Sequence, residues 1–237
     1  VAGDDRSYVY LFDKQGNYLS QVRLPESFGN LYINAKGYYV SSRTVILQSE
    51  AGLASKTSYG LFNDKFEPVA EFHARVTETK PPAGGDASSM VKFTAGILSR
   101  MAFQPVPRHI LTSDDSIYFG YPEDYSIDVY SPEGQKIGTI KREYEPIRIQ
   151  DKDREYFAAA IARPFLTRGG IPRSEEEIKN IINSLEYPKA KPAYYSFALM
   201  ENGSLLVVVE FVYGEYSLFD MFDNRGQYVG QFKTDFP

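Results

Sequence analysis

Apolar and polar residues alternate along this chain in pairs of short runs, and each pair is joined by a polar turn. The clearest copy is residues 125–140, where Ile127 and Val129 fall on one face of the first run. A period of two is the pattern of a half-buried β-strand. Pro132 presets one turn dihedral, and Gly134 can adopt the positive φ that a tight return needs. The segment therefore predicts a β-hairpin.

Three further segments repeat this hairpin pattern, namely residues 8–22, 59–72 and 216–232. In the copy at 59–72, Phe66 stands where the other copies have glycine. We expect that turn to use Asn63 and Asp64, because these residue types tolerate left-handed conformations.

A second set of hairpins precedes most of these copies, at residues 31–42, 109–121 and 195–213. Two consecutive hairpins make a four-stranded antiparallel meander, and repetition of that unit builds a β-propeller. The pattern predicts an all-β fold of four-stranded antiparallel blades. We expect a single propeller domain over 1–237, with blade-like units at 1–25, 26–77, 93–142 and 193–237.

About three and a half blades are visible, because the first unit holds only one hairpin. A propeller must close to protect its edge strands. We therefore expect the chain to be the C-terminal portion of a six-bladed ring, with the remaining N-terminal blades elsewhere in the protein or supplied by another chain. The first residue, Val1, is not an initiating methionine, which agrees with this expectation.

Residues 143–192 interrupt the β pattern and predict a helical insert, with helices near 150–187. Asp151 is expected to cap a first helix that stops before Pro164. Ser174 and Glu177 form a capping box for a second helix. That helix carries an amphipathic stripe made of Ile178, Ile181, Ile182 and Leu185. The stripe either packs on the protein's own fold or docks a partner, and we favour packing on its own fold.

Two stretches before the third blade are less regular. Residues 78–92 are rich in proline, glycine and small polar residues and predict a surface loop, as a tolerated insertion or as a substrate lid. Residues 93–107 are apolar, and we interpret them as an inner strand leading into the third blade.

Composition narrows the function classes. The net charge is −5 with no basic block, so a nucleic-acid partner is not expected. The chain contains no cysteine, which excludes disulfides, thiolate metal sites and cysteine nucleophiles. No apolar run approaches the length of a membrane span. The 15 % aromatic content, with 19 tyrosines and 16 phenylalanines, suits pleated and half-buried surfaces.

Candidate chemistry is sparse. The two histidines, His73 and His109, have no neighbouring ligand spacing, so we predict surface or strand-end roles rather than a metal site. Turn and cap roles are also expected for the paired acidic residues, in preference to calcium or acid–base sites. These pairs are Asp114 with Asp115, Asp151 with Asp153, and Asp220 with Asp223.

Four arginines flank the joins between predicted blades, namely Arg100, Arg108, Arg148 and Arg163. They would either line a positive central channel or form salt bridges with neighbouring carboxylates, and we favour the salt bridges. No catalytic, metal-binding or cofactor-binding residue is assigned, and no cofactor is predicted.

Residues 125–146, the run 188–193, the segment ENGSLLVVV at 201–209 and FDNRGQYVGQF at 222–232 resemble a group of bacterial six-bladed β-propeller proteins related to the NHL repeat group. The resemblance covers residues 109–237 well and residues 1–77 only as generic blades. It implies the fold and an extracytoplasmic location, periplasmic or extracellular, and it brings no catalytic set. Members of the group carry more N-terminal blades than this chain has.

Three functions follow as hypotheses. The first, which we favour, is a non-enzymatic recognition scaffold that binds a protein, peptide or glycan. The second is a calcium-dependent propeller hydrolase or lactonase, which needs a ring of inward carboxylates, amides and histidines. The third is a structural subunit whose open blade edge pairs with another chain by strand addition.

Overall fold

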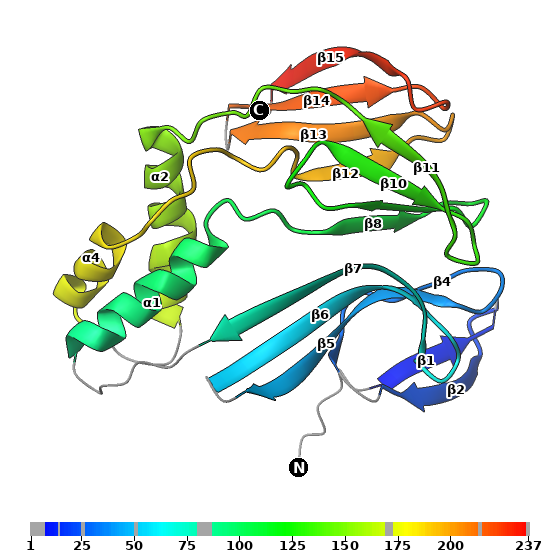
Figure 1. Ribbon diagram of the computed structural model, residues 1–237, viewed down its shortest axis with the longest axis horizontal. Coiled ribbons are helices and arrows are strands. Elements are labelled where there is room, and N and C mark those ends of the chain that lie inside the picture. Colours follow the sequence, from blue (N-terminus) through cyan, green and yellow to red (C-terminus); the bar gives the residue numbers. More distant parts are fainter. Residues whose placement is uncertain are drawn as a thin grey trace. The chain divides into compact units, whose positions relative to one another are not determined.

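The protein is described here by a computed structural model, shown in Figure 1. Two compact units make up the chain. Unit 1 comprises Val1–Lys80, His109–Phe119 and Asp128–Gly138, and unit 2 comprises Pro81–Arg108, Gly120–Ile127 and Thr139–Pro237. The structure describes residues 8–13, 15–24, 27–49, 52–79, 87–168, 173–212 and 215–235.

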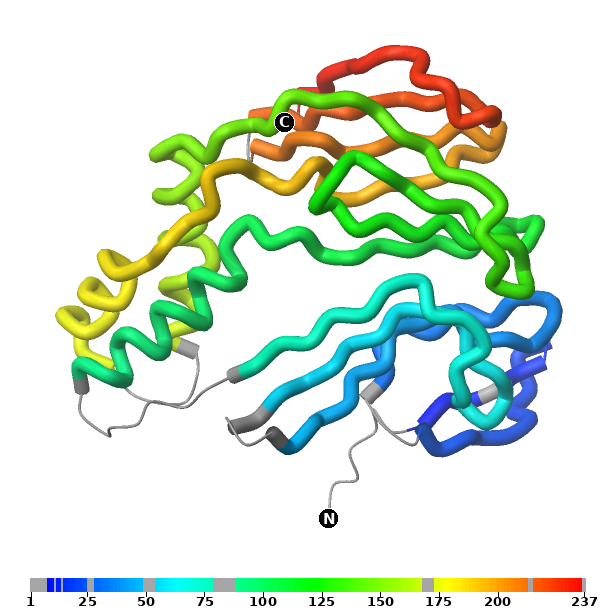
Figure 2. Tube along the Cα trace, in the orientation of Figure 1, coloured from blue at the N-terminus to red at the C-terminus, as the bar shows by residue number. Residues whose placement is uncertain are grey.

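Sheets of consecutive strands dominate the fold, as the alternating pattern predicts. The C-terminal sheet has the order β12-β13-β14-β15, and each neighbouring pair is antiparallel. Its course can be followed from orange to red in Figure 2. Its strands are β12 (Ser196–Leu199), β13 (Leu205–Val212), β14 (Tyr216–Phe222) and β15 (Tyr228–Asp235).

A second four-stranded sheet has the order β11-β10-β9-β8, so it too pairs strands that are consecutive in sequence. Its strands are β8 (Arg108–Leu111), β9 (Ile117–Gly120), β10 (Ser126–Tyr130) and β11 (Lys136–Lys141). Both four-stranded sheets have the meander topology of propeller blades, which confirms the predicted fold class.

Unit 1 contains a sheet in the order β3-β5-β6-β7, with β4 also pairing β5, and a two-stranded sheet of β1 and β2. The strands are β1 (Tyr8–Phe12), β2 (Tyr18–Arg23), β3 (Ser27–Phe28), β4 (Tyr32–Ile33), β5 (Tyr39–Ser49), β6 (Gly52–Phe62) and β7 (Pro68–Thr79). Within the described part of the first predicted unit, β1 and β2 form a two-stranded hairpin. That the blade-like units belong to one ring stays a prediction.

Hairpin turns in both units share one geometry. In each, the fourth residue is left-handed and its N–H donates to the carbonyl of the first. Glycine occupies this position in five turns, at Gly16, Gly37, Gly134, Gly203 and Gly226. Asp115 and Phe66 occupy it in two others, with φ of 63° and 59°.

The expected turn at residues 63–67 was therefore partly wrong. Asn63 is the first residue of the turn, and its side chain accepts the N–H groups of Lys65 and Glu67, each at 2.9 Å. Phe66, rather than Asn63 or Asp64, takes the left-handed conformation. Its buried ring stacks on Tyr39 with centroids 5.0 Å apart, so burial of the ring offsets the backbone cost.

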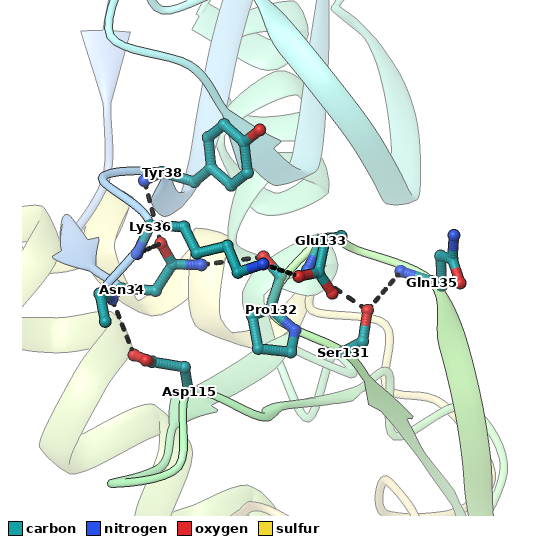
Figure 3. A network of polar contacts seen from close by, with 9 residues as sticks. Asn34, Lys36, Tyr38, Asp115, Ser131, Pro132, Glu133 and Gln135 are labelled. Atoms are coloured by element: carbon teal, nitrogen blue, oxygen red, sulfur yellow. Dashed lines mark hydrogen bonds and ion pairs between the residues drawn. The ribbon is translucent and has the colours of Figure 1, made fainter.

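Three of these turns contact one another within unit 1, as Figure 3 shows. The Asn34 side chain accepts N–H bonds from Lys36 and Tyr38 and donates to the Pro132 carbonyl at 2.9 Å. Asp115 accepts the Ala35 N–H at 3.0 Å, and Lys36 forms an ion pair with Glu133. The side chains that shape single turns therefore also join neighbouring hairpins.

The segment before the second sheet is a helix, α1 (Ala87–Met101), so the strand predicted over 93–107 was wrong. Ala95, Leu98 and Ala102 recur at helical spacing, and all three are buried. An apolar stretch of this length fits a strand or a buried helix, and only its partners decide between them. Residues 87–92 of the predicted loop belong to this helix, and residues 80–86 lie outside the described residues.

Helices occur in the predicted insert, as α2 (Asp151–Phe157), the π-helix η2 (Ala158–Ala162), α3 (Arg163–Arg168) and α4 (Glu175–Asn183). The first helix does not stop before Pro164, because η2 carries it directly into α3. Gln150 rather than Asp151 is the N-cap of α2, and Asp153 accepts the Gln150 N–H at 2.9 Å. The predicted capping box of Ser174 and Glu177 is confirmed.

One apolar core joins α1 to the insert, as the clustering of α1, α2 and α4 in Figure 1 illustrates. Ile178 and Ile181 of the predicted stripe are buried in it, and Ile182 and Leu185 pack against it. The stripe thus packs on the protein's own helices, as we favoured. Within the described residues, no helix combines the length and apolar character of a membrane span.

Candidate functional site

A pocket of about 510 Å³ lies in unit 2 between helical and sheet residues, and we call it the insert pocket. This volume is within the usual range for small-molecule sites. Three structural groups line it: the end of α1, the α2–η2 helix, and the β13 region with Tyr195. The lining residues are Met101, Phe103, Gln104, Lys152, Asp153, Tyr156, Phe157, Ile161, Tyr195, Phe211, Val212 and Glu215.

Phe103 enters the pocket wall because the chain reverses just after α1. Its φ is 52°, the left-handed conformation in which helices commonly end, although glycine usually occupies that position. The Phe103 ring lies 5.9 Å from that of Phe157 and 6.3 Å from that of Tyr187, measured between centroids. Aromatic packing therefore holds a strained residue at the pocket, a feature that is frequent at binding sites.

The π-helix η2 also contributes to the pocket wall. The Arg163 N–H donates to the carbonyl of Ala158, five residues earlier, which is the wide turn of a π-helix. Pro164 explains the widening, since it has no N–H and its ring disturbs the preceding helical turn. Ile161 lies in this segment, is 41 % exposed and lines the pocket. Such π-turns often occur at functional sites.

A buried ion cluster lies at the polar end of the pocket. The Lys191 side chain is 2 % exposed, and its Nζ is 2.9 Å from Asp153 Oδ1 and 2.8 Å from Glu210 Oε1. Burial disfavours the charged lysine, but the hydrogen bonds and charges of Glu210 and Asp153 outweigh it and raise the Lys191 pKa. Because Asp153 also caps α2, the cluster ties the helix to β13.

Two tyrosines surround this cluster. Burial, followed by the charges of Asp153 and Glu210, raises the pKa of Tyr195 well above its ordinary value. Tyr216 donates its hydroxyl to Glu210 Oε2 at 2.9 Å, and desolvation together with this bond raises its pKa to about 12. Both hydroxyls therefore stay protonated at neutral pH, and Tyr195 lines the pocket as a neutral polar residue.

The remaining charges in the lining are Lys152 and Glu215. Their side chains are about half-exposed, and Lys152 Nζ lies 3.7 Å from Glu215 Oε2. A pair at this distance and exposure contributes little to stability. The insert pocket thus combines apolar and aromatic walls with a small polar end, an arrangement that suits binding of an amphipathic group.

A smaller hollow of about 210 Å³ lies beside a second buried polar cluster in unit 2. Asp220 of β14 is fully buried and accepts bonds from Tyr125 Oη at 2.6 Å and Gln231 Nε2 at 2.9 Å, and it also pairs with Arg142. The Arg142 guanidinium lies 4.1 Å from the centroid of the Tyr228 ring. These contacts link two sheets, so we assign this cluster a structural role.

The acidic pairs considered from the sequence serve mostly as turns and caps. Asp114 accepts bonds from Thr112 and Ser116, and Asp223 accepts the N–H groups of Arg225 and Gln227. Asp220 differs, because it belongs to the buried ion pair. Among the described residues, no group of three or more histidine, aspartate and glutamate side chains is placed to hold a metal.

Both histidines lie in unit 1 and contact aromatic rings. His73 lies 6.2 Å from Tyr59, and His109 packs edge-on to Tyr32 at 5.5 Å, between centroids. Burial lowers the His109 pKa, and within the described residues its buried Nε2 has no hydrogen-bond partner. His109 is the second residue of β8 and is half-buried, so it lies near the start of that strand.

The candidate arginines make local contacts. Arg163 pairs with Glu175 at 2.5 Å, which is the salt bridge we favoured for it. Arg108 donates to the Tyr195 carbonyl at 3.1 Å, and Arg148 forms a backbone bridge with Ala190. Arg100 is in the last turn of α1.

Sequence reasoning assigned no role to Phe103, Tyr195 or Lys191. Lys191 lies in the run Pro-Lys-Ala-Lys-Pro, where nothing local distinguishes it from the neighbouring Lys189. The signal for Phe103 is weak as well, because recognising it requires knowing that α1 is a helix.

Fold and pocket together define a β-sheet protein with propeller-type meanders and a helical insert that borders a pocket. No family model matches the chain, and no curated protein matches it. The solved structure of a Bacteroides fragilis protein, described as exported, aligns over 97 % of this chain and 52 % of its own chain. The sequence identity is 11 % and the TM-score is 0.46. The chain therefore spans about half of that protein.

Virginiamycin B lyase from Staphylococcus aureus aligns with 98 % of this chain and 64 % of its own, at 10 % identity and a TM-score of 0.34. A Bacteroides caccae protein of unknown function aligns at 13 % identity with a TM-score of 0.26. Likenesses at this level assign no activity, and the fold assignment rests on the sheets themselves.

Proposed function

We propose that this protein is a non-enzymatic recognition module, and that its ligand enters the insert pocket. The observation that carries the proposal is a pocket of about 510 Å³ with apolar walls and a few polar groups at one end. The partner would be a protein, peptide or glycan, and one of its side groups would bind in the pocket. The meander sheets supply the scaffold, and we infer that they are parts of a six-bladed ring.

An extracytoplasmic location belongs to the same proposal. It is supported by the resemblance of residues 109–237 to exported bacterial propellers. Fractionation of the producing cells tests it, and recovery of the protein in the cytoplasm alone would contradict it.

Binding of the neutral dye N-phenyl-1-naphthylamine tests the pocket, because this dye fluoresces when it enters an apolar site. We expect saturable fluorescence enhancement with the wild-type protein. Ile161→Asp places a charge in the pocket wall and is expected to weaken dye binding by about tenfold or more, since burying a charge without a partner is costly.

The matched control is Ile137→Asp, the same change at a residue that is 62 % exposed in β11 and does not line the pocket. This control should retain dye binding. Equal loss in both variants, or no saturable binding by the wild type, would contradict the proposal. Circular dichroism of both variants verifies that each is folded.

Strand addition at β1 is a second candidate function, supported by a separate observation. Within the described residues β1 pairs only with β2, so its other edge has no strand beside it. Tyr10, Phe12 and Tyr18 lie on one face of this hairpin and are 47 %, 57 % and 56 % exposed. An exposed apolar edge strand is a template for pairing with another chain.

Size-exclusion chromatography with light scattering tests strand addition between copies. We expect a concentration-dependent dimer, and Tyr10→Pro should abolish it, because proline adds a ring and removes a donor at the edge. A stable monomer of the unmodified protein at high concentration would count against this candidate.

A further inference from the structure

The polar end of the insert pocket carries charged side chains, whereas its walls are apolar and aromatic. Of the charged side chains that line the pocket, two are carboxylates, those of Asp153 and Glu215, and one is the ammonium of Lys152. The lining itself therefore carries one negative charge in excess at neutral pH. An excess charge in a partly desolvated site favours a ligand group of opposite sign.

The two lysines are poorly placed to hold an anion. Lys191 is 2 % exposed, and its ammonium already contacts Asp153 and Glu210. The Lys152 ammonium is about half-exposed and has Glu215 as its neighbour at 3.7 Å. An anionic ligand would have to displace a carboxylate from one of these contacts.

A cation meets more favourable surroundings. The Glu215 carboxylate is 56 % exposed and lies 3.7 Å from the Lys152 ammonium. Tyr195, whose raised pKa keeps its hydroxyl protonated, lines the same pocket. The walls add the rings of Phe103, Tyr156 and Phe211. Aromatic faces attract ammonium and guanidinium groups, and carboxylates beside them increase the attraction.

We propose that the insert pocket selects a small amphipathic cation, namely an ammonium group carried on an aromatic or aliphatic body. The body occupies the apolar wall formed by α1, η2 and β13, and the ammonium lies at the Glu215 and Tyr195 end. This inference rests on the proposed binding function and adds the chemical class of the group that is bound.

Competition between the neutral dye and three probes of similar size tests the charge preference. The probes are phenethylamine, 2-phenylethanol and 3-phenylpropanoate, which carry a positive, neutral and negative end at pH 7.5. We expect the amine to displace the dye at roughly threefold to tenfold lower concentration than the alcohol, from the combined strength of an exposed ion pair and a cation–π contact. The carboxylate should be the weakest, and added salt should reduce the amine's advantage.

Glu215→Gln provides the residue-level test, with Glu201→Gln as the matched control at an exposed turn residue outside the pocket. The first variant should bring the amine to within about twofold of the alcohol, the range left when an exposed ion pair is lost. The control should keep the wild-type preference.

The outcomes separate the two proposals. If the dye and all three probes bind without preference for the amine, the charge inference is overturned and the binding pocket stands. If neither the dye nor any probe binds to the wild type, as checked by ligand-observed NMR, the proposed function fails as well. A preference for the amine that survives Glu215→Gln unchanged also overturns the assignment of Glu215.

Discussion

At the scale of single residues, burial decides several conformations that local preference would oppose. Phe66 and Phe103 have left-handed backbones, and both rings pack among other aromatic side chains. A left-handed non-glycine residue costs about 1–2 kcal/mol, whereas a buried aromatic ring contributes more than that. The rings therefore determine the backbone at these two positions.

Phe66→Gly tests this balance. The change introduces glycine, which occupies the same position in five other hairpin turns, but it removes a buried ring. We expect the free energy of unfolding to fall by about 2–4 kcal/mol, since the loss of the ring exceeds the relief of strain. Urea denaturation measures the difference.

Asp115→Gly is the companion variant, because Asp115 has the same backbone conformation and a half-buried polar side chain in place of a buried ring. Relief of strain and loss of its hydrogen bond to Ala35 should offset each other within about 1 kcal/mol. If Phe66→Gly were neutral or stabilising, the ring would not be what holds that turn.

Tyr195 leads to a prediction about alkaline pH. Its pKa is raised in the folded protein by burial and by the charges of Asp153 and Glu210. Above about pH 10, the ordinary tyrosine pKa, the unfolded chain loses this proton while the folded protein keeps it. The free energy of unfolding should therefore fall as pH rises, by about 1.4 kcal/mol per pH unit for this residue.

Urea midpoints between pH 9 and pH 11.5 measure that slope. Because phenylalanine does not titrate, Tyr195→Phe should make the slope shallower by the contribution of one proton, about 1.4 kcal/mol per pH unit. Below pH 10, the free energy of unfolding should change only through the packing effect of the lost hydroxyl. An unchanged slope in Tyr195→Phe would show that Tyr195 is not responsible.

At the scale of elements, the helical insert is held by a core of its own. Ile178 and Ile181 of α4 pack with Leu98 of α1 and Phe157 of α2 in one buried cluster. The capping box at Ser174 fixes where α4 begins, and the Asp153–Lys191–Glu210 cluster fixes α2 against β13. The walls of the insert pocket are thus set by the packing of α1 as much as by the insert.

Ile181→Ala is expected to lower the free energy of unfolding by about 2–4 kcal/mol, because it opens a cavity in this core. Ile161→Ala, at a residue that is 41 % exposed in the same insert, should cost less than about 1 kcal/mol. Thermal and urea unfolding compare the two. Equal effects would indicate that the helices do not share a packed core.

At the scale of the whole molecule, the carboxylates of the described residues are spread over turns and ion pairs, and no three of them gather with a histidine or with one another to hold a metal. The net charge is −5, and several carboxylates accept backbone N–H groups of their own turns, among them those of Asp13 and Asp223. These contacts occupy oxygens that a calcium site would otherwise use.

We therefore expect the melting temperature in 5 mM calcium to match that in EDTA to within about 1 °C, since only a ligand that prefers the native state shifts it. Calorimetry or a dye-based thermal scan makes the comparison. A rise of several degrees with calcium would instead favour the hydrolase hypothesis, and magnesium at the same concentration controls for ionic strength.

The sequence by itself determined the hairpin pattern of most strands, the turns that use glycine and the α4 helix. These features depend on local signals, namely period-two alternation, glycine at a fixed turn position, and a capping box before an apolar stripe. Such signals act between residues close in sequence, so they are readable without the fold. The resemblance over residues 109–237 added the propeller class to this local information.

Tertiary structure alone decided whether residues 93–101 form a helix or a strand, which residue of the 63–67 turn is left-handed, and how the helix passes Pro164. It also decided the insert pocket, whose residues come from α1, the insert and β13. Apolar runs fit more than one partner, and a lysine such as Lys191 becomes a buried ion only when Asp153 and Glu210 converge on it. Contacts between distant residues determine these features, and no local pattern encodes them.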